Sequence, residues 1–215
     1  MTVIYPDHAS RSYAAVILAA GTSSRMGKDK ALLTWHGKTF LTAAIEALMP
    51  FVQMVIVVGG ANTESLKQNV WSHGASLVTN PDPAQGQFSS LRVGLQEVLS
   101  RGRDAALITH VDRPPAAPRT IQALQTAFAF HSKDHKWAVV PQYGDKHGHP
   151  IVAGRELIEA FLKADLITTT ARDVEHAHQE RIVYLPVDDP NVIVNVNTPE
   201  EYTALVSTLS TPSPS

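Results

Sequence analysis

The sequence contains no cysteine, no long apolar run and no large excess of one charge. Without cysteine the chain has no disulfide framework, no thiol nucleophile and no thiolate metal site, which fits a reducing, cytoplasmic compartment. The formal net charge is -2. A nearly neutral chain holds an anion through a local cluster of donors and not through its overall field, so the composition argues against a general nucleic-acid binder.

Apolar stretches are too short to cross a bilayer, so we expect no membrane contact. The first of them, Tyr13–Ala20, has no basic region ahead of it and is typical of a buried strand, not of a signal sequence. Serine, threonine and proline dominate the last residues and predict a loose tail over residues 209–215. We expect a single domain over residues 1–215, with an ordered core from about 14 to 208.

Short β-branched runs alternate with longer amphipathic segments, which predicts a three-layer α/β/α fold around a mainly parallel, Rossmann-like sheet. The expected strands are Ala14–Leu18, Met54–Val58, Ser76–Val78, Ala105–Thr109, Ala138–Pro141, Ile182–Leu185 and Val192–Val194. We expect helices over Thr39–Met49, Ser90–Ser100 and Glu156–Lys163, where apolar residues recur at helical spacing. Two further helices are expected to begin at Pro118 and Pro199, because proline suits the first helical turn and a capping box surrounds Pro199.

The loop after the first strand has the strongest chemical signature. Its small residues let backbone N–H groups approach a phosphate chain, while Arg25 adds a bidentate fork and Lys30 a point charge. These features predict a polyphosphate site in which Arg25 and Lys30 neutralise charge. The residues expected to bind through their backbone are Leu18, Ala19, Ala20, Gly21 and Thr22. The spacing matches neither G-x-x-x-x-G-K-[ST] nor G-x-G-x-x-G.

The stretch from Leu18 to Lys30 reads L-A-A-G-x-S-x-R-M-G-x-x-K. This pattern resembles the signature of the molybdenum cofactor nucleotidyltransferases, within the glycosyltransferase-A-like superfamily of nucleotidyltransferases. The resemblance implies the nucleotide-diphospho-sugar transferase type of sheet. Ala20 stands where the guanylyl branch tends to have a second glycine, so the loop looks more like the cytidylyltransferase branch.

Further segments extend the resemblance over residues 14–202. The run from Gly86 to Leu95 is similar to a G-x-x-S-S-L-x-x-G-L segment that lines the nucleotide pocket in cytidylyltransferases, and it follows Asn80 at the end of a strand. The resemblance therefore implies nucleotide-binding roles for Asn80, Gly86, Ser89 and Ser90. From the residues alone, either serine by itself is better explained as a cap of the following helix.

Asp112 follows a buried strand, where open α/β sheets bind ligands and where a carboxylate can hold Mg²⁺. The resemblance implies that it is a magnesium ligand, whereas a turn aspartate before proline is the alternative. Asn197 stands where an aspartate is common in the cytidylyltransferase branch, so we expect it to offer an uncharged oxygen to the metal. Arg113 departs from the family pattern, and it either pairs with substrate or faces water.

Gly148, His149 and Pro150 match a G-H-P tripeptide that the resemblance places on the acceptor side of the site. His147 and His149 alone do not complete a zinc site, because no cysteine or acidic cluster accompanies them. The segment Asp165–Arg172 replaces a glycine-containing turn of the family, which leaves the identity of the acceptor open.

These features predict an Mg²⁺-dependent transfer of a nucleotide, CMP from CTP in first place, to a phosphorylated acceptor such as molybdopterin. Arg25, Lys30 and Asp112 are the expected catalytic residues, and the metal is held by Asp112 and Asn197. The resemblance also implies transient contact with molybdoenzymes or their chaperones. Two alternatives remain open: a nucleotide-binding regulator or cofactor chaperone without turnover, and a nicotinamide or flavin oxidoreductase suggested by the glycine turn after Val55–Gly60.

Overall fold

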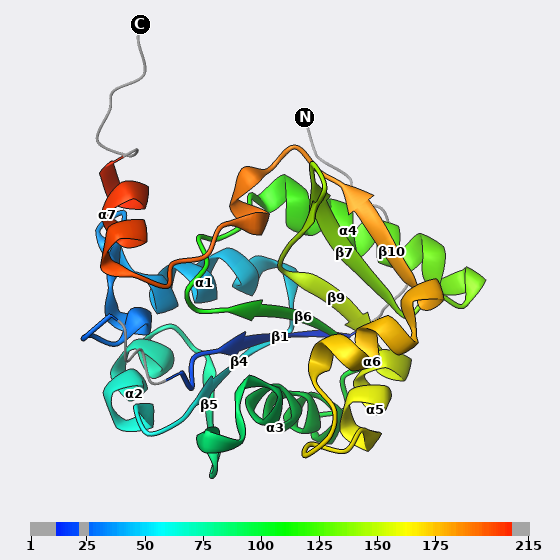
Figure 1. Ribbon diagram of the computed structural model, residues 1–215, viewed down its shortest axis with the longest axis horizontal. Helices are drawn as coiled ribbons and strands as arrows, with labels where there is room; N and C mark the ends of the chain where they lie inside the picture. The colour runs from blue at the N-terminus through cyan, green and yellow to red at the C-terminus, as the bar shows by residue number, and fades with distance from the viewer. Residues whose placement is uncertain (1–11, 22–25, 208–215) are drawn as a thin grey trace, which may run out of the picture.

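The computed structural model describes residues 12–21 and 26–207. Its main sheet has the strand order β10-β7-β9-β6-β1-β4-β5, and β8 pairs with β7 (Figure 1). The strands are β1 (Tyr13–Leu18), β4 (Met54–Gly59), β5 (Ser76–Thr79), β6 (Ala105–His110), β7 (Ala138–Tyr143), β8 (Lys146–His147), β9 (Ile151–Gly154) and β10 (Ile182–Pro186). Strand β9 is antiparallel to β6 and β7, and β8 is antiparallel to β7. The other pairs are parallel.

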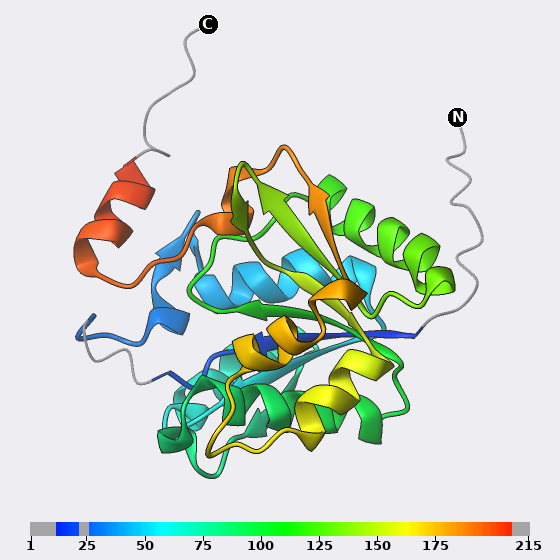
Figure 2. The same ribbon diagram turned by 45° about the vertical axis from the view of Figure 1, so that its right-hand side comes forward.

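Helices cover both faces of the sheet, so the predicted three-layer α/β/α fold is confirmed (Figures 1 and 2). One face packs against α1 (Phe40–Leu48), α2 (Thr63–Ser72) and α4 (Pro118–His131). The other face packs against α3 (Gln87–Ser100), α5 (Arg155–Lys163) and α6 (Ala171–Ala177). Because both faces are covered, consecutive residues of β1 are buried on opposite sides, and the strand reads as a continuous apolar run.

Helix α3 approaches the centre of the sheet closely because Gly94 faces it. A Cβ on Gly94 would lie 2.6 Å from a methyl carbon of Val16 in β1 and 2.9 Å from one of Val58 in β4. Any larger side chain would therefore push the helix away from the sheet. This packing fixes the start of α3 near the carboxyl ends of β1 and β4.

The strand predicted over Val192–Val194 is wrong. The segment forms the 3-10 helix Pro190–Ile193, which begins at a proline and is capped by the Asp189 side chain. Val192 is fully buried, so its apolar character reflects core packing and not strand pairing. Its carbonyl accepts a hydrogen bond from the backbone N–H of His149. Hydrophobicity alone does not distinguish these two situations.

The last helix, α7 (Pro199–Ser207), begins with the predicted capping box. The backbone N–H of Glu201 donates to the Thr198 hydroxyl, and that of Thr198 donates to the Glu201 carboxylate. Helix α7 packs beside the short hairpin of β2 (Thr34–Trp35) and β3 (Lys38–Thr39). The hydroxyl of Tyr202 donates to the Thr34 carbonyl at 2.9 Å, which fixes the helix to this hairpin.

Within residues 12–21 and 26–207, the helices lack the combined length and apolar character needed to span a bilayer.

Candidate active site

The central strands β1 and β6 end together. Leu18 and His110, their last residues, are register partners, and the backbone N–H of Val111 donates to the Leu18 carbonyl at 3.0 Å. The chain leaves β1 toward β4 on one side, whereas β6 pairs with β1 on the other side. Such a switch of direction opens a crevice at the carboxyl ends of the strands, where open α/β sheets bind ligands.

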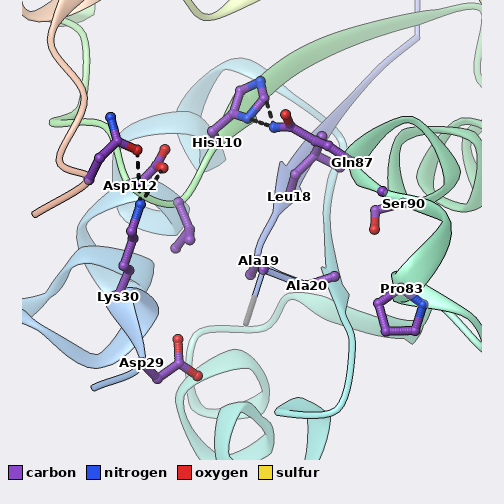
Figure 3. A pocket seen from close by; sticks show the side chains of 14 residues that line it. Leu18, Ala19, Ala20, Asp29, Lys30, Pro83, Gln87, Ser90, His110 and Asp112 are labelled. Carbon is purple, nitrogen blue, oxygen red and sulfur yellow. Dashed lines mark hydrogen bonds and ion pairs between the residues drawn. The ribbon is translucent and has the colours of Figure 1, made fainter. Parts of the chain in front are cut away.

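A pocket of about 380 Å³ occupies this crevice, and we call it the Lys30 pocket (Figure 3). It is lined by Leu18, Ala19, Ala20, Gly21, Asp29, Lys30, Pro83, Gly86, Gln87, Ser90, His110, Val111, Asp112 and Asn197. Figure 3 shows Lys30 and Asp112 on one side of the pocket and Ser90 and Pro83 on the opposite side. The structure therefore brings together most of the residues that the sequence predicted as nucleotide and metal ligands.

Lys30, Asp112 and Asn197 meet at one point of this pocket. The ammonium nitrogen of Lys30 lies 3.1 Å from Oδ2 of Asp112 and 3.1 Å from Oδ1 of Asn197. The Lys30 and Asp112 side chains retain 15% and 24% of their exposure, so the ion pair is only partly open to water. Three segments distant in sequence thus place a cation and two oxygen ligands at the end of β6.

Asn62 holds the segment that precedes Lys30 against the end of β1. Its Nδ2 donates to the Ala19 carbonyl at 2.9 Å and to the carboxylate of Asp29 at 2.7 Å. The other oxygen of the Asp29 carboxylate caps the 3-10 helix Lys30–Leu32 through the N–H of Ala31. Sequence reasoning assigned no role to Asn62 or Asp29. Asn62 lies outside the motifs, Asp29 occupies a variable position of the pattern from Leu18 to Lys30, and only the fold brings the two together.

The glycine turn after β4 also packs against this loop. A Cβ on Gly60 would lie 2.8 Å from the Ala20 carbonyl oxygen, and the Gly60 N–H donates to Oδ1 of Asn62 at 3.0 Å. The glycine pair that suggested a nicotinamide or flavin site therefore allows close packing beside Ala20.

Asn80 and the two serines form a buried group at the opposite wall. Nδ2 of Asn80 donates to the hydroxyls of Ser89 and Ser90 at 2.8 and 2.9 Å. Ser90 lines the pocket, whereas Asn80 and Ser89 lie behind it. The serines do not cap α3 as the alternative predicted, because Gly86 is its N-cap residue with φ 88° and both serines lie in the first turn.

A second pocket of about 950 Å³, which we call the His149 pocket, adjoins the first. The two share Leu18, Gly86, Gln87 and His110 in their linings. Of the predicted acceptor residues, Gly148 and His149 line the His149 pocket, whereas Pro150 is buried outside it. A Cβ on Gly148 would lie 2.3 Å from the Val192 carbonyl oxygen, so this glycine is required for packing.

Three nitrogen-bearing side chains gather where the two pockets meet. The ring centroids of His110 and His149 lie 4.6 Å apart in an edge-to-face arrangement, and Gln87 contacts His110 through its amide. Burial, followed by the charge of Arg113, lowers the pKa of His110 to about 4. Burial, followed by His110 and Arg113, lowers the pKa of His149 well below its ordinary value. Sequence reasoning assigned no role to His110 or Gln87.

The oxygens of Asp112 and Asn197 fit a magnesium ion that is shared with a phosphate ligand. They converge on one cation in this structure, the Lys30 ammonium, and both are the hard oxygen donors that Mg²⁺ prefers. In the part of the chain that the structure describes, no group of three or more acidic, histidine or cysteine side chains forms a protein-only metal cage. Mg²⁺ typically takes one or two carboxylates and completes its shell with phosphate oxygens and water.

Two predicted residues, Thr22 and Arg25, lie outside the described ranges.

Lys30, Asp112 and the backbone of Leu18–Gly21 line one pocket at the switch point of a mainly parallel sheet, an arrangement typical of a nucleotidyltransferase. The MobA-like NTP transferase domain model matches residues 15–183, more than half of the chain, so this chain belongs to that family of enzymes.

Named relatives agree with this assignment. The chain is 24% identical over 191 residues to the molybdenum cofactor cytidylyltransferase of Escherichia coli strain K12, covering 87% of this chain and 92% of the relative. It is 26% identical over 196 residues to a molybdenum cofactor guanylyltransferase of Xanthomonas euvesicatoria pv. vesicatoria, covering 91% and 95%. The crystal structure of Rv0371c from Mycobacterium tuberculosis H37Rv has the same fold, with a TM-score of 0.77, 24% identity and coverage of 91% of this chain and 98% of that one.

Proposed function

We propose that this enzyme transfers CMP from CTP to the phosphate of molybdopterin or a closely related molybdenum cofactor precursor, with release of pyrophosphate. The observation that carries the proposal is the meeting of Lys30, Asp112 and Asn197 at the end of β6, beside the backbone of Leu18–Gly21. The acceptor is inferred from the names of the relatives, which are molybdenum cofactor nucleotidyltransferases.

The choice of CTP rests on the sequence of two segments that line the Lys30 pocket. Ala20 and Ser90 both line it, and both belong to segments that resemble the cytidylyltransferase branch. The E. coli cytidylyltransferase is among the relatives, although guanylyltransferases are too. Discrimination between the two bases is therefore the first property to measure.

The reaction requires positioning and charge neutralisation more than proton transfer. An oxygen of the acceptor phosphate forms a bond to the α-phosphorus, the bond from that phosphorus to the α–β bridging oxygen breaks, and pyrophosphate leaves. A phosphate dianion is already a nucleophile at neutral pH, so no general base is needed. Lys30, with Arg25 by prediction, neutralises the phosphates, and backbone N–H groups after Leu18 orient them.

Asp112 and Asn197 would hold Mg²⁺, which supplies Lewis-acid stabilisation of charge on the phosphate oxygens when it is bound. Asn197 brings no negative charge, so we expect weaker metal binding than with two carboxylates. We expect the enzyme to act in the cytoplasm and to contact molybdoenzymes or their chaperones transiently when it hands over product.

A magnesium-dependent thermal-shift screen against CTP, GTP, ATP and UTP tests the donor. We expect a rise in Tm with CTP and Mg²⁺ that exceeds the rise with the other three nucleotides. A larger rise with GTP would reassign the donor, and no rise with any nucleotide would contradict the proposed binding site. Release of pyrophosphate on addition of molybdopterin then tests the acceptor and separates a working enzyme from a nucleotide-binding regulator.

A further inference from the structure

The end of β6 presents side chains to both pockets. His110 lines both of them, Asp112 lines the Lys30 pocket and Arg113 lines the His149 pocket. Adjacent residues of one turn therefore bring a negative charge to one pocket and a positive charge to the other. Under the proposed function, the acceptor must meet the α-phosphorus where the pockets join, so these side chains lie beside the reaction.

Arg113 has few partners for a half-buried guanidinium. Its Nη1 donates to the carbonyls of Val192 and Val194 at 3.4 and 3.5 Å, which are long hydrogen bonds. Its Nε is buried and has no hydrogen-bond partner among the described residues. Asp112 is near enough to act on its pKa, yet the two side chains form no ion pair in the described part of the chain. A half-buried guanidinium with unused donors is costly unless a ligand completes its hydrogen bonds.

The two neighbouring imidazoles add nitrogen atoms and no negative charge. His149 contributes a ring in edge contact with His110, and its buried Nδ1 lacks a hydrogen-bond partner among the described residues. The ring of His110 is contacted by the amide of Gln87, which is neutral. Arg113 supplies the positive charge of this group, while Asp112 lines the other pocket and Glu175 lines a further part of the His149 pocket. An anion is the ligand that complements the unused guanidinium donors.

We propose that Arg113, together with His110 and His149, binds the phosphate monoester of the acceptor and holds it at the junction of the two pockets. The guanidinium fork matches two phosphate oxygens, and its charge offsets the repulsion between the acceptor phosphate and the triphosphate. The role in catalysis rests on the proposed function, whereas anion binding by these three side chains does not. The triphosphate itself is the other source of a phosphate group near this point.

Histidine-labelled protein gives a direct readout of this subsite. In ¹⁵N-histidine protein, the imidazole signals of His149 are identified by their loss in His149→Asn, and inorganic phosphate is then titrated. We expect these signals to shift in the wild type, and the phosphate affinity to fall about tenfold or more in Arg113→Met. Arg119→Met is the matched control, because Arg119 is an exposed arginine of α4 beside Asp188 and lines neither pocket.

The control variant should keep the wild-type affinity for phosphate. Equal loss of phosphate affinity in Arg119→Met and Arg113→Met, or unchanged affinity in Arg113→Met, would overturn the subsite. If Arg113→Met unfolds, Arg113→Lys replaces it: the retained charge should give weak binding, with the geometry of the fork lost. Wild-type affinity in Arg113→Lys would contradict recognition by the fork.

Repeating the titration with saturating CTP and Mg²⁺ separates the two sources of phosphate. If the subsite serves the acceptor, phosphate still shifts the His149 signals; if the triphosphate occupies it, the shift disappears and the proposal fails. Failure of the proposed function would give a different result. The thermal-shift screen would show no rise in Tm with any nucleotide, while inorganic phosphate would still shift the imidazole signals of His149. In turnover assays, Arg113→Met should raise the KM for the acceptor and leave the KM for CTP unchanged.

Discussion

The ammonium group of Lys30 lies 3.1 Å from a carboxylate oxygen of Asp112, although the two residues are 82 positions apart. Lys30 follows the loop after β1, and Asp112 follows β6. Because β1 and β6 are parallel neighbours, their carboxyl ends meet at one edge of the sheet. The pair therefore joins the predicted phosphate-binding loop to the predicted metal ligand.

Replacement of Lys30 by methionine removes the charge and keeps much of the side-chain volume. We expect the rate of pyrophosphate release to fall by about 10²–10³, because one preorganised group that stabilises transition-state charge is lost. Lys30→Arg keeps the charge, so its rate of pyrophosphate release should fall less than that of Lys30→Met. Lys38→Met is the matched control, since Lys38 is exposed and pairs with Glu46 away from the pocket. Turnover within twofold of wild type in Lys30→Met would remove Lys30 from the catalytic residues.

Asn197→Asp should strengthen metal binding. The substitution adds a carboxylate beside Asp112, and we expect the affinity for Mn²⁺, measured by electron paramagnetic resonance with a non-hydrolysable CTP analogue, to rise at least about tenfold. Asn195→Asp adds the same charge at an exposed position two residues away and serves as the control. Equal increases in both variants would show a general field effect and contradict a direct ligand role for residue 197.

Asp189 stabilises the loop that packs behind Asp112 and Arg113. Its buried carboxylate accepts hydrogen bonds from the backbone N–H of Ala117 and the hydroxyl of Thr120, both at 2.7 Å, and from the N–H of Asn191. We expect Asp189→Ala to lower the free energy of unfolding by about 3 kcal/mol, because several buried donors lose their partner. Asp188→Ala changes the neighbouring exposed carboxylate. In urea denaturation, this control should lose about 0.5 kcal/mol or less of its free energy of unfolding. Equal losses in the two variants would refute the stabilising role of Asp189.

His149 should make the protein less stable in acid. Its pKa is lowered in the folded state by burial and by the nearby His110 and Arg113, so the unfolded chain takes up a proton near pH 6.5 while the folded chain does not. The unfolded state then binds more protons, and the free energy of unfolding decreases as pH falls below about 6.5, by up to about 1.4 kcal/mol per pH unit. Above that pH the contribution is complete.

Urea denaturation between pH 7.5 and 5 measures this slope. In His149→Asn the decrease below pH 6.5 should be shallower than in the wild type, whatever the absolute stability of the variant. Parallel slopes for the two proteins would show that His149 titrates as freely in the folded chain as in the unfolded one.

Most of the fold follows from local sequence patterns. The six confirmed strands are short, mainly apolar runs, and the central ones, β1, β4 and β6, are largely buried, whereas β5 and β10 at the two ends of the sheet are partly exposed. Pro118 and the capping box at Thr198 mark helix starts accurately. The strand predicted at Val192 was wrong, because an apolar run is equally compatible with a buried 3-10 helix. The antiparallel strand β9 was not given bounds, since it follows a polar turn and only its pairing with β6 and β7 defines it.

The residues of the candidate site that belong to a sequence motif could be predicted. Lys30, Asp112 and the backbone after Leu18 were found from spacing and from resemblance, and the structure brings them into one pocket. Asn62 and His110 were not, because their positions matter only after the sheet places distant loops together. Of the three residues Asn80, Ser89 and Ser90, only Ser90 lines the pocket, and buried Asn80 donates to the hydroxyls of both serines. The order of residues in the sequence does not show which of them faces the pocket.

We propose that a triphosphate binds between Leu18–Gly21 and Lys30, with its metal at Asp112. Anomalous diffraction from crystals grown with Mn²⁺ and a non-hydrolysable CTP analogue would locate the metal and the triphosphate in one experiment. We expect one strong manganese peak bonded to the Asp112 carboxylate and to phosphate oxygens in the Lys30 pocket. A peak away from Asp112, or a triphosphate lying in the His149 pocket, would contradict it.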